Sequence, residues 1–144
     1  MPIDGSENSM EAADYAVKMA EKYGSEVSAI HVINIDKNLQ LLGIHRLSYP
    51  DPIKKKIEEA RTEVQKWLTE ITKNAEHRNV RIKTEIIEDS PMSVVSTIVN
   101  YAEEEKADLI VIGTRGRSGI SKMLLGSVAS GVVSYAPCPV VVLK

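Results

Sequence analysis

A glycine-rich segment that follows a short apolar run is the part of the chain best suited to chemistry. Residues 109–112 read Leu-Ile-Val-Ile, and three glycines come soon after them: Gly113, Gly116 and Gly119. Because glycine has no Cβ, its backbone amide can approach a bound phosphate closely. A second apolar segment begins at Gly126-Ser127, where the first turn of a helix would present unpaired N–H groups to an anion. The segment favours binding of a polyphosphate.

Charged side chains in the same segment agree with this chemistry, since Arg115, Arg117 and Lys122 are cationic. The spacing differs from the Walker A loop, because no Gly-Lys-Ser/Thr stands four residues after a glycine. It also differs from the dinucleotide fingerprint G-x-G-x-x-G. On spacing alone, a flexible basic loop with glycines at its turns stays open as the alternative.

The elements that would position this loop alternate along the chain. Short runs rich in Val and Ile predict strands over residues 27–35, 80–87, 109–112 and 140–143. Apolar residues spaced three and four apart predict helices over residues 9–23, 53–75 and 93–105, with a further helix from Gly126-Ser127. Gly24 is expected to end the first helix, and Ser90-Pro91 to begin the third.

Alternation of this kind predicts an α/β protein with an open, mostly parallel five-stranded sheet and helices on both faces. A strand should precede the first helix, and only Met1 and Ile3 are available as its end. We therefore expect the first strand to be truncated at the N-terminus of the numbered sequence. Residues 1–144 are expected to form a single domain.

The composition excludes several classes of protein. With 43% hydrophobic and 26% charged residues, the chain is not expected to be disordered. A net charge of -2 excludes a globally basic nucleic-acid binder. The single cysteine, Cys138, excludes a disulfide framework. No apolar run approaches the roughly 20 residues that span a bilayer, and residues 1–14 lack the pattern of a signal peptide. The prediction is a cytoplasmic protein with no membrane or nucleic-acid partner.

Four motifs in order resemble the universal stress protein family, specifically its ATP-binding branch. Gly113, Gly116, Gly126 and Ser127 follow the spacing G-x2-G-x9-G-[ST] of that branch. The other three motifs are Pro-Ile-Asp-Gly-Ser at residues 2–6, His-Val at 31–32 and Ala-Pro-Cys-Pro-Val-Val-Val at 136–142. The resemblance covers essentially the whole chain and favours the phosphate loop over the flexible loop.

The resemblance implies a Rossmann-like fold of the adenine nucleotide alpha hydrolase type that binds ATP, with Mg²⁺ or Mn²⁺ bridged by the phosphates. It assigns no protein ligand to the metal and no catalytic residue. The residues that it implies for the nucleotide are Pro2, Ile3, Asp4, Val32, Gly113, Thr114, Arg115, Gly116, Arg117, Ser118, Gly119, Gly126, Ser127, Val128 and Ala129.

Each part of this set has an implied role. Pro2 and Ile3 would line the base pocket, and Asp4 would contact the ribose or the adenine edge. The backbone of Val32 would hold adenine, residues 113–119 would wrap the ribose and phosphates, and residues 126–129 would hold the terminal phosphates. As alternatives, Asp4 caps the first helix and Val32 is an ordinary buried strand residue.

Other polar residues are given structural interpretations. His31, His45 and His77 show no metal-ligand spacing, so we expect packed or solvated histidines. Cys138 is interpreted as a small hydrophobe rather than a reactive thiol. The triplet Lys54-Lys55-Lys56 is interpreted as a solvated helix face.

The final strand, Val140–Leu143, is apolar and terminal, and such an edge requires cover. The resemblance implies a homodimer through this strand, and an edge shielded within the monomer is the alternative. The function expected is an ATP-binding stress or regulatory protein, read by an unknown protein partner, without efficient catalysis. Two alternatives stay open: a slow or partner-dependent ATPase, and a dimeric interaction module that binds AMP or another adenine nucleotide.

Overall fold

The computed structural model describes residues 1–33, 49–88, 92–114 and 125–144. Helices and strands alternate along the chain, as the sequence predicts: α1 (Glu7–Tyr23), β1 (Val27–Val32), α3 (Asp51–His77), β2 (Ile82–Ile87), α4 (Val94–Glu104), β3 (Ile110–Gly113), α5 (Ser127–Tyr135) and β4 (Val140–Leu143). Within the described residues, none of the helices is both long and apolar enough to cross a membrane.

Local chemistry explains where the helices begin and end. The side chain of Ser6 accepts a hydrogen bond from the Ser9 N–H and begins α1, and Gly24 ends it at a φ of 66°, as predicted. α4 begins at Ser93, whose side chain accepts from the Ser96 N–H at 3.1 Å. Ser90 and Pro91 lie outside the described residues, and within the described residues Ser93 caps α4, because its hydroxyl reaches the free N–H group of Ser96.

The strands pair in parallel. β1 pairs with β2 from Val27↔Ile82 to Val32↔Ile87, and β3 pairs with β4 from Ile110↔Val140 to Gly113↔Leu143. The described residues thus form two separate two-stranded sheets. The α/β class with parallel strands is confirmed, and the five-stranded sheet stays a prediction.

The first three residues extend the β1–β2 sheet by a short parallel bridge between Pro2 and Ile30. The Ile3 N–H donates to the Ile30 carbonyl at 2.8 Å, and the Ile30 N–H donates to the Met1 carbonyl at 2.9 Å. This bridge places Asp4 next to the carboxyl end of β1.

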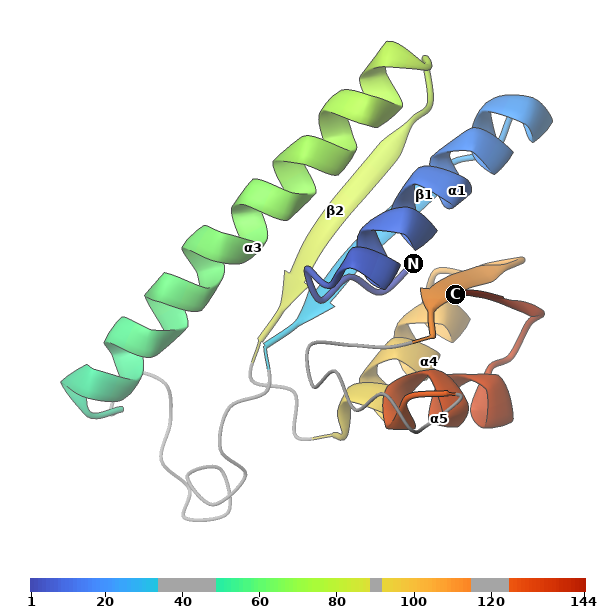
Figure 1. Ribbon diagram of the computed structural model, residues 1–144. Helices are drawn as coiled ribbons and strands as arrows, with labels where there is room; N and C mark the ends of the chain where they lie inside the picture. The colour runs from blue at the N-terminus through green and yellow to red at the C-terminus, as the bar shows by residue number, and fades with distance from the viewer. Residues whose placement is uncertain (34–48, 89–91, 115–124) are drawn as a thin grey trace.

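Helices cover both faces of the strands (Figure 1). On one face, Val17 of α1 and Val64 and Leu68 of α3 pack in one buried cluster with Ala29 of β1. On the other face, Ile98 of α4 packs with other buried residues: Val132 of α5, Ile30 of β1 and Ile112 of β3. The core is mainly aliphatic, in line with the absence of Phe, and Tyr49 is its buried aromatic residue among the described positions.

The β1–β2 and β3–β4 pairs leave a groove of about 570 Å³ at their amino ends, lined among others by Met1, Ser28, Tyr101, Leu109 and Val111. We call it the amino-end groove. The Met1 amine donates to the Ser28 carbonyl there at 2.6 Å. Burial lowers the pKa of this amine to about 5.

Candidate functional site

A cavity of about 250 Å³ lies at the opposite, carboxyl ends of β1 and β3. We call it the carboxyl-end pocket. Its walls come from the first residues of the chain, the ends of both strands, the start of α4 and the start of α5. Open α/β proteins bind ligands at this edge, because the loops and helix N-termini that follow parallel strands meet there.

The pocket brings together ten of the fifteen residues that the sequence analysis singled out. They come from four separate segments: Pro2, Ile3, Asp4, Val32, Gly113, Thr114, Gly126, Ser127, Val128 and Ala129. The other five lie outside the described residues: Arg115, Gly116, Arg117, Ser118 and Gly119.

One wall of the pocket is the first turn of α5. Gly126 is its N-cap, with extended backbone and no capping side chain, and the Ser130 N–H donates to the Gly126 carbonyl at 2.8 Å. The intervening amides belong to the first turn, where the helix itself supplies no acceptor. They give this wall a partial positive charge suited to an anion.

One backbone hydrogen bond joins that turn to the residue that follows β3, and a second joins that residue to β4. The Gly126 N–H donates to the Thr114 carbonyl at 2.7 Å, and the Thr114 N–H donates to the Leu143 carbonyl at 2.6 Å. The two ends of the glycine-rich segment are therefore held side by side at the pocket.

Gly113 has a packing role that spacing did not reveal. A Cβ at this position would lie 2.8 Å from the backbone carbon and oxygen of Asn8, at the start of α1. Only glycine lets the end of β3 approach α1 so closely. Gly113 therefore sets the distance between β3 and the Asp4 side of the pocket.

Asp4 occupies a turn that leads into α1. Its Oδ1 accepts hydrogen bonds from the Ser6 N–H at 3.0 Å and from the Ser6 hydroxyl at 2.6 Å. The alternative interpretation of Asp4 as the helix cap is wrong, because Ser6 caps α1. Asp4 instead orients Ser6, and these hydrogen bonds keep the Asp4 carboxylate at the edge of the pocket.

Val32 is the last residue of β1 and is half-buried at the pocket, and the contact of its backbone with adenine stays a prediction. Sequence reasoning missed other lining residues: Ser9, Ile30, His31, Val94, Ile98 and Ile112. Val94 and Ile98 stand four residues apart on the apolar face of α4, and no local signal shows that this face meets the pocket. They give the pocket an aliphatic wall, as ligand sites commonly have.

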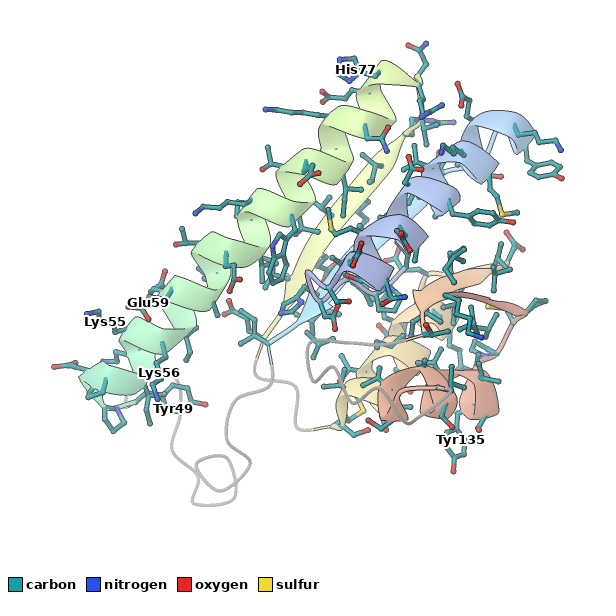
Figure 2. The ribbon with its side chains drawn as sticks, viewed as in Figure 1. Tyr49, Lys55, Lys56, Glu59, His77 and Tyr135 are labelled. Carbon is teal, nitrogen blue, oxygen red and sulfur yellow. The ribbon has the colours of Figure 1, made fainter. Side chains whose placement is uncertain are left out.

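His31 is half-buried and lines the pocket. Its Nδ1 lies 2.6 Å from the carbonyl oxygen of Ile3, and its ring meets the Trp67 ring edge-on, with centroids 5.7 Å apart. It is thus a packed histidine, as predicted. His77 is exposed at the end of α3, as Figure 2 shows, and His45 lies outside the described residues.

The described residues contain no group of three or more His, Cys, Asp or Glu side chains that could hold a metal. Cys138 packs against the cluster beneath α4 and α5, and burial raises the pKa of its thiol, in line with the interpretation as a small hydrophobe. Lys54, Lys55 and Lys56 are exposed, and Figure 2 shows Lys55 and Glu59 at the same end of α3. Their exposure agrees with a solvated face.

The fold and the pocket together define an α/β protein with a ligand-sized cavity at the carboxyl ends of parallel strands, between a helix N-terminus and an aliphatic wall. The sequence pattern of the universal stress protein family matches residues 1–144. The chain belongs to the universal stress protein family.

Individual relatives match this chain over 99% or more of its length. A universal stress protein of Methanocaldococcus jannaschii is 40% identical over 144 residues, which are 100% of this chain and 79% of the relative. A solved universal stress protein from Archaeoglobus fulgidus in complex with dAMP has a TM-score of 0.70 and 20% identity, covering 99% of this chain and 94% of that one. A solved universal stress protein in complex with cAMP has a TM-score of 0.64 and 24% identity, covering 100% and 93%.

Proposed function

We propose that this protein binds ATP in the carboxyl-end pocket and acts as a nucleotide-dependent regulatory module without efficient catalysis. The observation that carries the proposal is the meeting, in one cavity, of an aliphatic wall with the amides of a helix N-terminus. An adenine base requires the aliphatic wall, and a phosphate chain requires the amides of the helix N-terminus. The structures solved with dAMP and cAMP support an adenine nucleotide as the ligand class.

The pocket suggests how the nucleotide lies. The base would lie between the Val32 backbone and the side chains of Val94 and Ile98. The ribose would lie toward Asp4. The phosphates would extend toward Ser127 and the first turn of α5, where the segment that carries Arg115 and Arg117 begins and ends. Mg²⁺ or Mn²⁺ would be held by phosphate oxygens and water, since magnesium commonly keeps few protein ligands.

We expect no efficient catalysis, and the side chains support this proposal. Phosphoryl transfer needs a group that orients the nucleophile at the terminal phosphate. Among the described lining residues, Asp4 and His31 are those with a carboxylate or an imidazole. The carboxylate accepts hydrogen bonds from Ser6, and the ring contacts the Ile3 carbonyl. Both groups thus have structural partners, and in the proposed pose both would lie toward the ribose.

Calorimetric titration of nucleotide-stripped protein with Mg-ATP tests the binding proposal. We expect Gly126→Val to abolish ATP binding, because its side chain would fill the space of the phosphates. Valine fits the backbone there, since φ is -67°. Ser130→Val is the matched control, because it places the same side chain on the exposed face of α5. Unchanged ATP affinity in a folded Gly126→Val variant would contradict the phosphate assignment.

The two alternative functions have their own outcomes. A turnover above about 1 per second that Ser127→Ala abolishes would favour an ATPase. Binding of AMP as tight as that of ATP would favour the module that uses another adenine nucleotide. In either case the pocket residues stay the same and the biological role changes.

We further propose that a homodimer forms through Val140–Leu143, completing a cytoplasmic regulatory module read by a protein partner. Among the described residues β4 pairs only with β3, and all four of its residues are half-buried in the single chain. Sedimentation over a range of concentrations tests this. Val141 packs in the cluster beside Ala12 and Ala16. The variant Val141→Lys therefore needs a thermal melt beside it to separate dissociation from unfolding.

A further inference from the structure

Two side chains, His31 and Trp67, hold the strand end that carries Asp4, and the sequence analysis gave neither of them a role in the pocket. His31, on β1, places its Nδ1 2.6 Å from the Ile3 carbonyl oxygen, one residue before Asp4. A carbonyl only accepts hydrogen bonds, so the ring nitrogen donates. This bond ties the Asp4 wall of the pocket to β1.

Trp67, on α3, packs against the same strand end. Gly5 has a φ of +77°, and a Cβ there would clash with Cζ2 of the Trp67 ring. The indole therefore lies directly against the backbone that follows Asp4. A glycine is required at this position for both its conformation and the space.

The two side chains also contact each other, with their rings at 70° and their centroids 5.7 Å apart. Trp67 is carried by a rigid helix, between the buried residues Val64 and Leu68 that pack α3 onto the core. His31, Trp67 and Gly5 thus join the pocket wall to α3.

We propose that His31 and Trp67 are positioning residues for the nucleotide: together they set the distance of the Asp4 wall from Val32 and from Gly113 across the pocket. This inference rests on the proposed function. We expect the two residues to affect binding of the adenosine half of the ligand, because in the proposed pose the ribose lies toward Asp4 and the phosphates lie toward α5.

Titrations of adenosine and of Mg-ATP into His31→Leu, His31→Asn and wild-type protein test the proposal. Leucine fills the space but donates no hydrogen bond, so we expect affinity for both ligands to fall about tenfold, the effect of one lost hydrogen bond. The amide nitrogen of asparagine stands where Nδ1 stands in histidine, so His31→Asn is expected to restore most of the affinity. His77→Leu is the matched control, since His77 is exposed at the far end of α3 (Figure 2).

Ser127→Ala supplies the contrasting pattern, because it removes a hydroxyl from the phosphate side. It is expected to weaken ATP and leave adenosine unchanged, whereas His31→Leu weakens both. A general loss of fold would not produce rescue by asparagine. If wild-type protein binds and His31→Leu binds equally well, the positioning role is wrong while the proposed function stands. If wild-type protein binds neither adenosine nor ATP, the proposed function is wrong and this inference falls with it.

A second measurement does not depend on the stability of a His31 variant. Trp67 is the single tryptophan of the chain, so its fluorescence reports on one place. We expect adenosine to change the emission of wild-type protein, because the indole contacts the backbone next to Asp4. Binding by calorimetry with no change in emission would contradict a role for Trp67.

Discussion

The carboxyl-end pocket and the amino-end groove lie at opposite ends of the same gap between β1 and β3. They share three lining residues, Pro2, Ile30 and Ile98. The polar groups differ. The pocket collects one carboxylate, three hydroxyl side chains and the first turn of α5, while the groove is lined among others by three carboxylates, the Lys106 side chain and a buried amine whose pKa is lowered to about 5.

This difference follows from the direction of the strands. In a parallel arrangement every strand enters from the same end, so helix N-termini and the loops before them gather at the other end. The groove receives helix C-termini and the starts of strands instead. Chain direction therefore gives the pocket, and not the groove, the free amides of the α5 N-terminus.

Ile98→Ala is expected to have the largest effect, since Ile98 is 3% exposed and lines both hollows. Loss of three carbons from a buried site costs about 3 kcal/mol of unfolding free energy, measured by urea denaturation. Adenosine affinity should fall as well, because the base loses an aliphatic contact. Ile53→Ala, on a partly buried position of α3 outside both hollows, is the control for stability. Unchanged adenosine affinity would mean that the base lies elsewhere.

Gly113→Ala is expected to have the second-largest effect, and to change the carboxyl-end pocket while leaving the amino-end groove unchanged. Its Cβ would meet the Asn8 backbone at 2.8 Å, so α1 must move, at a cost of about 2 kcal/mol. The shift moves the pocket wall and should weaken nucleotide binding, while the groove lies at the other end of β3. Thermal melts and calorimetry measure the two effects. A variant as stable as wild type would contradict the close approach of α1 and β3.

Particular residues show how much the sequence could predict. The end of α1 at Gly24 and the four strands follow local patterns, and resemblance brought Asp4, Gly113 and Ser127 together before any coordinates. The place of Val94 at the pocket could not be found this way, because it depends on how α4 packs. His31 stood in a motif, but its contact with the Ile3 carbonyl depends on how β1 packs against the first residues. The cap of α4 was not fixed either, because two serines stood near the predicted helix and only geometry selects Ser93.

A salt series is expected to show a smaller effect and to sharpen the contrast within the pocket. ATP affinity should fall as ionic strength rises, because salt screens the phosphates from the cations of the loop and the first turn of α5. Adenosine carries no charge, so its affinity should change little between 0.05 and 0.5 M salt. Over this range the Debye length falls from about 14 to about 4 Å. Calorimetry with each ligand measures both slopes. Parallel slopes would mean that the phosphates lie away from these charges.

Tyr101→Phe is expected to have the smallest effect and to test the groove by itself. Tyr101 lines the groove and lies in the last turn of α4, and burial raises the pKa of its hydroxyl. Phenylalanine keeps the ring that packs with the cluster beneath α4, so stability should change by less than about 1 kcal/mol. Nucleotide affinity should equal that of wild type, since no donor of the pocket is touched. A clear loss of ATP affinity would show that the two hollows are coupled through α4, and that chain direction alone does not separate their functions.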